Sequence, residues 1–375
     1  MTFAWLPETE KTATPLTPGL HSSIFLQEKA ILENRPLLRK AIEDAYTSLA
    51  SARAMVIADL GCSSGPNTLL VVAEVIGTIR DCSNRAVELQ FFLNDLPSND
   101  FNLVFQSLDR LQDLTRKEDQ GKETATPSYY VAGLPGSFYK RLFPCDSVNL
   151  FHSSYSLHWL SKVPYELSAG SYVNEGNIYV GRTTPHTVIT LFREQFENDL
   201  ELFLTLRSKE LVTGGRMLLT FQGRKGQPML MHGEIGTMYE LLSESLRSLV
   251  LKGRVEKAKL DSFNLPLYAP SVDEVKAVIN HTKLFDIEHI GLIELNWDPQ
   301  DDDSDDDHVL PDPASSGTNL AKTVRSVLGP LIAGHFGEDI IDELFAAYAS
   351  ILARHLEEGN AKCPVIVVSL KKAMH

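Results

Sequence analysis

A glycine-containing turn that begins with an acidic residue is the first feature of the sequence that could hold a ligand. The turn, Asp59–Asn67, reads Asp-Leu-Gly-Cys-Ser-Ser-Gly-Pro-Asn. An apolar run over residues 54–60 leads into it, and a helical pattern over residues 68–80 follows. Glycine lets the backbone approach a ligand closely, and a helix start offers N–H groups without partners inside the helix. The segment therefore predicts a ligand-binding turn between a strand and a helix.

A second acidic residue, Asp95, follows the apolar run over residues 87–93. An acid at the end of the second strand can accept hydrogen bonds from both ribose hydroxyls. Turn and acid together predict a nucleoside cofactor. Ser63 replaces the second glycine of the dinucleotide motif, which suits a sulfonium cofactor because it has no pyrophosphate to cradle. Asp59 suits the ammonium group of such a cofactor. A nicotinamide dinucleotide stays an alternative at this point.

Apolar runs alternate with helical patterns along the whole chain. The predicted strands cover residues 54–60, 87–93, 128–132, 148–152, 216–221 and 364–370, and a long helix is predicted over residues 23–52. This alternation predicts an α/β fold with a doubly wound, mostly parallel sheet. Residues 165–210 and 225–360 contain more helical pattern than the sheet needs, so we assign them to a largely helical substrate cap. The remainder divides into an N-terminal arm, 1–22, and a cofactor-binding domain, 23–164, 211–224 and 361–375.

Composition and charge exclude several classes of protein. The chain has 375 residues with a net charge of −14 and no basic stripe, which argues against a nucleic-acid partner. No apolar run is long enough to span a membrane, and the N-terminus has no secretory pattern. The 4 cysteines lack CxxC spacing, which favours free thiols and a cytoplasmic protein. The acidic run Asp301–Asp307 is typical of a solvated loop. Calcium binding stays an alternative, although the run lacks the glycine and glutamate of an EF-hand loop.

Four ordered strings resemble the SABATH family of plant methyltransferases. They are Asp59–Asn67, Phe92–Asn102, Gly136–Pro144 and Ser153–Ser161, and the similarity extends from about Gln27 to Lys371. The family includes salicylate, benzoate, jasmonate and indole-3-acetate carboxyl methyltransferases and xanthine-alkaloid N-methyltransferases. The resemblance implies a class I, Rossmann-like methyltransferase fold, S-adenosyl-L-methionine as cofactor, a homodimer, and a small carboxylic acid as substrate.

The resemblance also implies roles for individual residues. The cofactor would be bound by Asp59, Gly61, Cys62, Asn67, Asp95, Leu96, Ser137 and Phe138. The acceptor would be faced by Gln27, Tyr155, His158 and Trp159, with a variable wall of Met238, Tyr239, Val324 and Phe345. A magnesium ion in some members lies at the positions of Asn174, Asp261, Phe263 and Asn264. The segment ending at Gln27 departs from the family pattern, with Leu20 in place of a tyrosine and Ser23 in place of an asparagine.

Methyl transfer from a sulfonium to a carboxylate requires no general base, because an acid with a pKa near 4 is already ionised at neutral pH. The Gln27 amide and the Trp159 indole N–H are neutral donors that can orient a carboxylate. His158 is expected to be a wall residue or an acceptor contact and not a base. Aromatic side chains at Tyr155, Trp159, Tyr239 and Phe345 favour a flat acid of the salicylate, benzoate or cinnamate type.

Other activities stay open on the sequence alone. Indole-3-acetate or jasmonate is the nearest rival acceptor, followed by a nitrogen or sulfur acceptor in the same family. A nicotinamide-dependent reductase and a catalytically silent acid binder are alternatives from other classes.

Overall fold

A computed structural model of the chain describes residues 27–49, 53–82, 87–118, 126–226, 234–297, 312–357 and 362–374. The expected N-terminal arm, residues 1–22, and the acidic run Asp301–Asp307 lie outside the described residues.

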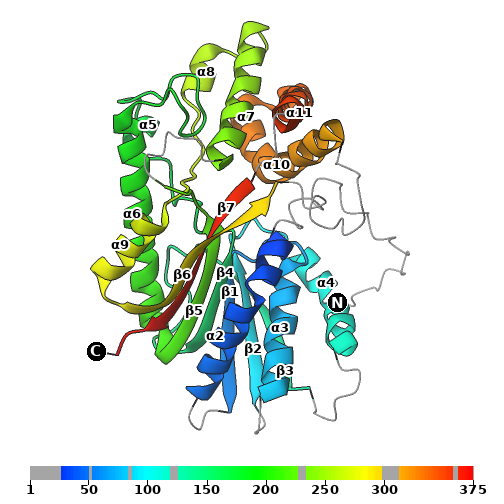
Figure 1. Ribbon diagram of the computed structural model, residues 1–375, viewed down its shortest axis with the longest axis vertical. Helices are drawn as coiled ribbons and strands as arrows, with labels where there is room; N and C mark the ends of the chain where they lie inside the picture. Colours follow the sequence, from blue (N-terminus) through cyan, green and yellow to red (C-terminus); the bar gives the residue numbers. More distant parts are fainter. Residues whose placement is uncertain are drawn as a thin grey trace, which may run out of the picture.

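In this part of the chain, a seven-stranded sheet forms the centre of the protein (Figure 1). Its strands are β1 (Ala54–Leu60), β2 (Glu88–Asp95), β3 (Tyr129–Pro135), β4 (Val148–Ser154), β5 (Leu211–Gln222), β6 (Phe285–Asn296) and β7 (Lys362–Lys372). The order is β3-β2-β1-β4-β5-β7-β6. Neighbours from β3 to β5 are parallel, and β7 pairs antiparallel with β5 and β6. The predicted α/β fold with a doubly wound, mostly parallel sheet is confirmed.

Helices cover both faces of the sheet (Figure 1). One face carries α2 (Arg35–Thr47), α3 (Asn67–Cys82) and α4 (Phe101–Glu118). The opposite face carries α6 (His186–Glu210) and α9 (Val272–Thr282). The central strands β1 and β4 are therefore almost fully buried, which explains why both are short apolar runs in the sequence.

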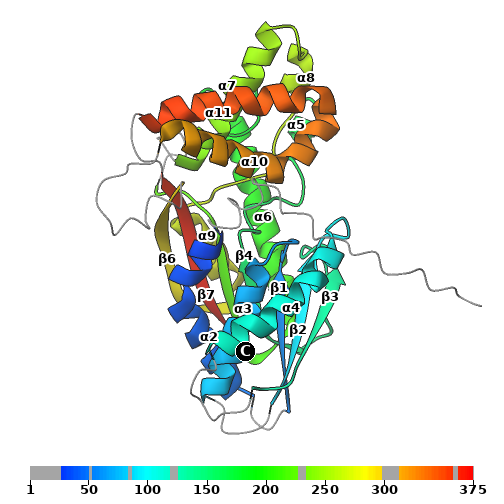
Figure 2. The same cartoon turned by 90° about the vertical axis from the view of Figure 1, so that its right-hand side faces the viewer.

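A helical cap lies beyond the carboxyl ends of the parallel strands (Figure 2). It contains α5 (Tyr165–Ser168), α7 (Glu234–Leu251), α8 (Lys257–Asp261), α10 (Pro313–Phe336), the short 3₁₀ helix η2 (Glu338–Ile340) and α11 (Ile341–Glu357). Helix α11 packs against both α10 and α7, and α7 contacts β7. Within the described ranges, no helix is both long and apolar enough to cross a membrane.

Three elements within the residues assigned to the cap lie on the sheet instead. Strand β6 is the edge strand next to β7, and α9 and α6 pack beside it on one sheet face. Polar residues interrupt β6, and Asp286, Glu288 and Glu294 are exposed, as is common on a sheet edge. The apolar run that marks a buried strand is therefore missing, and the sequence pattern alone does not reveal β6.

The long helix predicted over residues 23–52 is broken in the structure. Residues 27–33 form one helix and α2 begins at Arg35, with Pro36 in its first turn. Proline has no N–H and clashes with the preceding turn inside a helix, so the break falls at this position. The buried Asn34 lies between the two helices and donates from Nδ2 to the Ala30 carbonyl at 2.8 Å.

Candidate active site

The predicted cofactor turn lies between β1 and α3, where the strand order of the sheet reverses. Gly61 has a φ of +80°, and a Cβ on it would lie 2.0 Å from Ser156 Oγ, so only glycine fits there. The N–H groups of Gly61 and Cys62 donate to the Asn94 carbonyl at 2.8 and 2.9 Å. These bonds hold the turn against the end of β2. Ligands of open α/β sheets bind at this switch point, outside the carboxyl ends of the strands.

The structure brings Asp95 against this turn. Its Oδ2 accepts the N–H of Ser63 at 2.7 Å, and its Oδ1 accepts the N–H of Leu96 at 2.7 Å. Burial raises the pKa of the Asp95 carboxyl, although these two backbone donors oppose the rise. The Leu96 side chain is exposed, so its surface is available to a flat ring. An acid and an apolar side chain thus stand side by side next to the turn.

Asp59 has a different environment from Asp95. It is buried, its Oδ2 accepts the Thr68 hydroxyl at 2.6 Å, and its Oδ1 lies 2.7 Å from His152 Nδ1. These contacts tie β1 to the start of α3 and to β4. Asp59 therefore holds the turn in place through buried side-chain contacts. Sequence reasoning missed Thr68 and His152, although His152 ends the predicted fourth strand and could have been noticed there.

Cys62 and Asn67 lie within this turn. Burial and the nearby carboxylates of Asp59 and Asp95 raise the pKa of the Cys62 thiol, so Cys62 stays protonated and is a poor nucleophile. Asn67 Nδ2 donates to Gln27 Oε1 at 3.1 Å. With its oxygen engaged in this way, the Gln27 amide keeps its NH₂ group for donation to a ligand.

Ser137 and Phe138 follow β3 and lie at the same carboxyl end of the parallel strands as the turn. Asn94 Nδ2 donates to the carbonyls of Leu134 and Gly136 at 2.7 and 2.9 Å, which fixes the start of this loop beside β2. The Cε1 atom of Phe138 lies 3.8 Å from the position of a Cβ built on Gly61. The Phe138 ring therefore borders the glycine turn.

The predicted acceptor residues follow directly after β4. Tyr155 has a φ of +55°, which is uncommon for a bulky residue, and its N–H donates to the Thr220 carbonyl at 2.8 Å. The ring of His158 lies 6.3 Å from that of Tyr155 and 6.0 Å from that of Trp159. The three side chains therefore form one aromatic group at the end of β4.

His158 is buried, and its Nδ1 has no hydrogen-bond partner among the described residues. Burial lowers the pKa of His158 to about 3. The imidazole is therefore neutral at physiological pH and is a weak base.

The predicted variable wall comes from three cap helices. Met238 and Tyr239 lie on α7, Val324 on α10 and Phe345 on α11, and all four are buried. Tyr348 donates from its hydroxyl to the Met238 carbonyl at 3.0 Å, which joins α11 to α7.

Tyr155, Tyr239 and Cys363 of β7 are buried in one hydrophobic core. Burial raises the pKa values of both Tyr155 and Tyr239. The Tyr239 hydroxyl also donates to Gln222 Oε1 at 3.2 Å. Neither Cys363 nor Gln222 was singled out from the sequence.

The residues matched to a magnesium site are close together but do not fit a magnesium ion. Asn174 Nδ2 lies 3.4 Å from Asn264 Oδ1, while Asn174 Oδ1 accepts the Thr184 hydroxyl at 2.8 Å. The single carboxylate, Asp261, pairs with Lys257 at 2.6 Å and accepts the Gly176 N–H. Phe263 packs in the core. Magnesium prefers carboxylate oxygens and water, and here the one carboxylate already has a cationic partner. Across the described residues, no cluster of three or more His, Cys, Asp or Glu side chains could hold a metal.

The fold and the site together define an S-adenosylmethionine-dependent methyltransferase. The glycine turn, the Asp95 carboxylate and the Phe138 ring all lie at the carboxyl ends of the parallel strands, and this arrangement suits a nucleoside cofactor. A solved structure described as loganic acid methyltransferase with SAH matches this chain with a TM-score of 0.78 at 29% sequence identity. The match covers 97% of this chain and 98% of the other.

The chain belongs to the SAM-dependent carboxyl methyltransferase family, the SABATH family, whose model matches residues 21–373. Among similar proteins, anthranilate O-methyltransferase 3 of Zea mays is 46% identical over 93% of each chain. Benzoate O-methyltransferase of Zea mays is 45% identical, over 92% of this chain and 94% of its own. The protein is therefore an S-adenosylmethionine-dependent carboxyl methyltransferase, as the resemblance predicted.

Proposed function

We propose that the protein forms the methyl ester of a small aromatic acid of the benzoate, anthranilate or salicylate type. The observation that carries this proposal is the aromatic group at Tyr155, His158 and Trp159, whose Tyr155 lies in the same hydrophobic core as Tyr239 of the cap. Flat side chains of this kind favour stacking or edge contacts with an aromatic ring. The names of the two maize relatives support the same class of acceptor.

On the cofactor side, this chain supplies a fixed turn and a few polar contacts. Bound S-adenosylmethionine supplies an electrophilic methyl group on a positively charged sulfur. Asp95 would accept the ribose hydroxyls, and Leu96, Ser137 and Phe138 would border the adenine. Gly61, Cys62 and Asn67 would line the amino-acid end. Asp59 holds the turn through Thr68 and His152, so its contribution is to orient the backbone that meets the ligand.

On the acceptor side, Gln27 and Trp159 would hold the carboxylate with one oxygen in line with the methyl group. That oxygen forms the new C–O bond as the C–S bond breaks, which leaves the methyl ester and S-adenosylhomocysteine. Positioning of this kind can contribute about 7–11 kcal/mol. Neutral donors orient the carboxylate without stabilising the ground-state anion as strongly as an arginine would. Burial by the cap excludes water from the reacting groups.

The absence of a required general base predicts a flat pH profile. For an aromatic acid, kcat should vary by less than about twofold between pH 6 and pH 8.5, because the acid is ionised and His158 is neutral throughout. The check is initial-rate kinetics at saturating cofactor and acid. A limb with a midpoint near 6.5 that disappears in the His158→Gln variant would show that His158 acts as a base.

The proposal includes no magnesium ion. We expect treatment with EDTA, followed by desalting, to change kcat/KM for the acid by less than about twofold, because Lys257 already neutralises the Asp261 carboxylate. The Lys257→Ala variant is the matched control, since it frees Asp261 for a cation. Loss of wild-type activity in EDTA with recovery on adding Mg²⁺ alone would contradict this expectation.

A methyl-transfer screen tests the acceptor class. Purified protein would be incubated with methyl-labelled S-adenosylmethionine and, separately, with benzoate, salicylate, anthranilate, cinnamate, jasmonate, indole-3-acetate, an amine and a thiol. We expect methyl esters from the aromatic acids at the highest kcat/KM. Preferential labelling of jasmonate, the amine or the thiol would overturn the proposed acceptor class. Binding of an aromatic acid without ester formation would indicate a silent binder.

We further propose that the protein works as a cytoplasmic homodimer. The family resemblance supports the dimer. All 4 cysteines lie within the described residues and no disulfide joins any two of them, which supports a reducing compartment. Light scattering should give the mass of two chains, and a fluorescent fusion in plant cells should fill the cytoplasm. A mass of one chain would contradict the homodimer. A fluorescent signal confined to the secretory pathway would contradict the cytoplasmic location.

A further inference from the structure

Two side chains in the last turn of α6 hold the loop that joins β3 to β4. The loop spans residues 136–147 and forms neither helix nor strand. The side chains of Arg207 and Glu210 are both 0% exposed and form an ion pair, in which Arg207 Nη2 donates to Glu210 Oε1 at 3.2 Å. Partly or fully buried backbone groups outside helices and strands need other hydrogen-bond partners, and this ion pair supplies them for four such groups of the loop.

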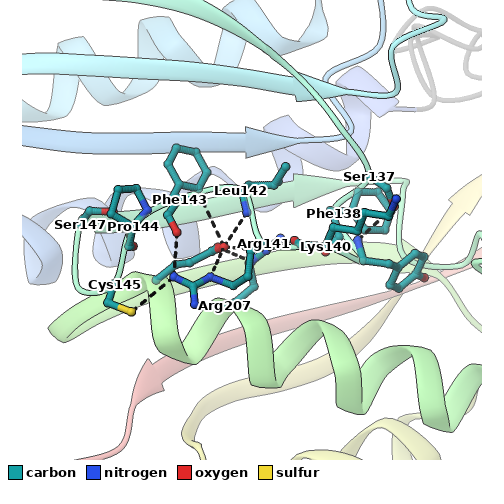
Figure 3. Close-up of polar contacts among 12 residues, drawn as sticks. Ser137, Phe138, Lys140, Arg141, Leu142, Phe143, Pro144, Cys145, Ser147 and Arg207 are labelled. Carbon is teal, nitrogen blue, oxygen red and sulfur yellow. Dashed lines mark hydrogen bonds and ion pairs between the residues drawn. The ribbon is translucent and has the colours of Figure 1, made fainter.

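Arg207 contacts the first half of the loop through its guanidinium (Figure 3). One terminal nitrogen donates to the Phe138 carbonyl at 3.0 Å, and the other donates to the Lys140 carbonyl at 2.8 Å. The guanidinium also lies 5.3 Å from the centre of the Phe151 ring and 5.4 Å from that of Phe203. Its planar fork thus fixes two carbonyls that flank Tyr139.

Glu210 contacts the second half of the loop. Its Oε1 accepts the N–H of Leu142 at 2.7 Å and the N–H of Phe143 at 3.1 Å. The same oxygen accepts Arg141 Nε at 3.2 Å. The cation therefore satisfies carbonyls and the anion satisfies N–H groups of one continuous segment.

This segment begins with the residues that border the cofactor turn. The Phe138 ring contacts the region of Gly61, and its carbonyl is the one that Arg207 holds. Phe203, which packs against Arg207, also meets the Phe138 ring edge-on with 6.0 Å between ring centres. Arg207 therefore fixes both the backbone and the ring of Phe138.

Stability alone is a weak reason for such a pair. Burying two charges costs desolvation, and apolar residues of similar volume often stabilise a protein equally well. What apolar residues cannot do is satisfy two carbonyls and two N–H groups in one loop. We propose that Arg207 and Glu210 are positioning residues that set the adenine wall at Ser137 and Phe138 before the cofactor binds. This rests on the proposed function only in placing the adenine at these two residues.

The Arg207→Lys variant tests the proposal, because lysine keeps the charge but loses the planar fork. Calorimetry without acceptor should show a Kd for S-adenosylhomocysteine about tenfold higher than wild type, which corresponds to about 1.4 kcal/mol. Kinetics should show a KM for S-adenosylmethionine raised by a similar factor, with kcat at saturation within about threefold of wild type. An unchanged Kd in the folded variant would overturn the proposal.

Arg224→Lys is the matched control, since Arg224 forms another buried arginine–glutamate pair, with Glu274. Arg224 holds the Ala269 carbonyl at 2.6 Å. The segment around Ala269 contacts residues 158–160, because Tyr268 N–H donates to the His158 carbonyl. This pair therefore serves the acceptor side, and its variant should leave the Kd for S-adenosylhomocysteine within about twofold of wild type. An equal rise in both variants would show general loosening and refute a specific role for Arg207.

Hydrogen exchange of wild-type protein gives a test that does not depend on a variant folding. Without cofactor, the amides of Leu142 and Phe143 should exchange at least about 100-fold more slowly than in an unstructured peptide. Free exchange until S-adenosylhomocysteine is added would mean that the cofactor orders the loop and would overturn the proposal. If wild type binds S-adenosylhomocysteine but esterifies no acid, the proposed function fails while both tests of the ion pair still apply.

Discussion

The Asp95→Ala variant is expected to bind S-adenosylhomocysteine at least about 100-fold more weakly than wild type while keeping its fold. Asp95 stands at the end of β2 with both oxygens directed by the N–H groups of Ser63 and Leu96. Hydrogen bonds to a charged group contribute about 1.5–3 kcal/mol each, so losing two bonds to ribose hydroxyls accounts for this change. Calorimetry measures the affinity, and circular dichroism checks the fold.

Asp100→Ala is the matched control for this variant. Asp100 lies in the same string, and its Oδ1 accepts the N–H groups of Asn102 and Leu103 at the start of α4. Removing it should lower the free energy of unfolding by about 1 kcal/mol without changing cofactor affinity, because its role is to cap a helix. Full affinity in Asp95→Ala, or equal loss in both variants, would refute the assignment of Asp95.

The titration of Asp95 adds an independent check. Burial keeps the pKa of this carboxyl above its ordinary value despite two backbone donors. Protonation weakens a carboxylate as an acceptor, so affinity for S-adenosylhomocysteine should fall as pH drops, beginning above the ordinary aspartate pKa of about 3.9. The Asp95→Asn variant cannot ionise and should bind weakly with no such dependence. An identical pH profile in both proteins would assign the effect to another group.

The sequence was sufficient to predict that the glycine turn and Asp95 lie close together, because parallel strands align their carboxyl ends. Asp59–Asn67 and Asp95 follow two apolar runs, and the pairing of β1 with β2 brings Leu60 opposite Asn94. Proximity of the turn and the acid then follows from the sheet alone. Ser137 and Tyr155 follow β3 and β4, so the same alignment brings them to the carboxyl ends of the strands.

Features that depend on packing between distant elements could not be predicted in this way. Arg207 and Glu210 lie in a helix with many charged residues, and nothing in their spacing reveals that these two are buried. The contacts of Asp59 with Thr68 and His152 depend on three elements meeting at one point. Strand β6 lacks an apolar run because it is an edge. The burial of Tyr239 in one core with Cys363 depends on how α7 packs against β7.

Replacing Trp159 by phenylalanine is expected to lower kcat/KM for the aromatic acid by between about 10-fold and about 150-fold, because one neutral donor to the carboxylate is lost. The KM for S-adenosylmethionine should stay within about twofold of wild type. The backbone of Trp159 is held independently of its indole, since its N–H donates to the Ser156 carbonyl and its own carbonyl accepts the Tyr139 hydroxyl at 2.7 Å. Steady-state kinetics with each substrate varied in turn measures both constants.

The Trp297→Phe variant separates loss of a functional donor from loss of an indole in general. Trp297 is buried, and its Nε1 has no hydrogen-bond partner in the part of the chain that the structure describes. Removing that N–H breaks no bond, so both KM values should match wild type within about twofold. Equal increases of both KM values in Trp159→Phe would make Trp159 a structural residue. Unchanged kinetics would mean that Gln27 alone orients the carboxylate, and the Gln27→Ala variant should then lose nearly all carboxyl transfer.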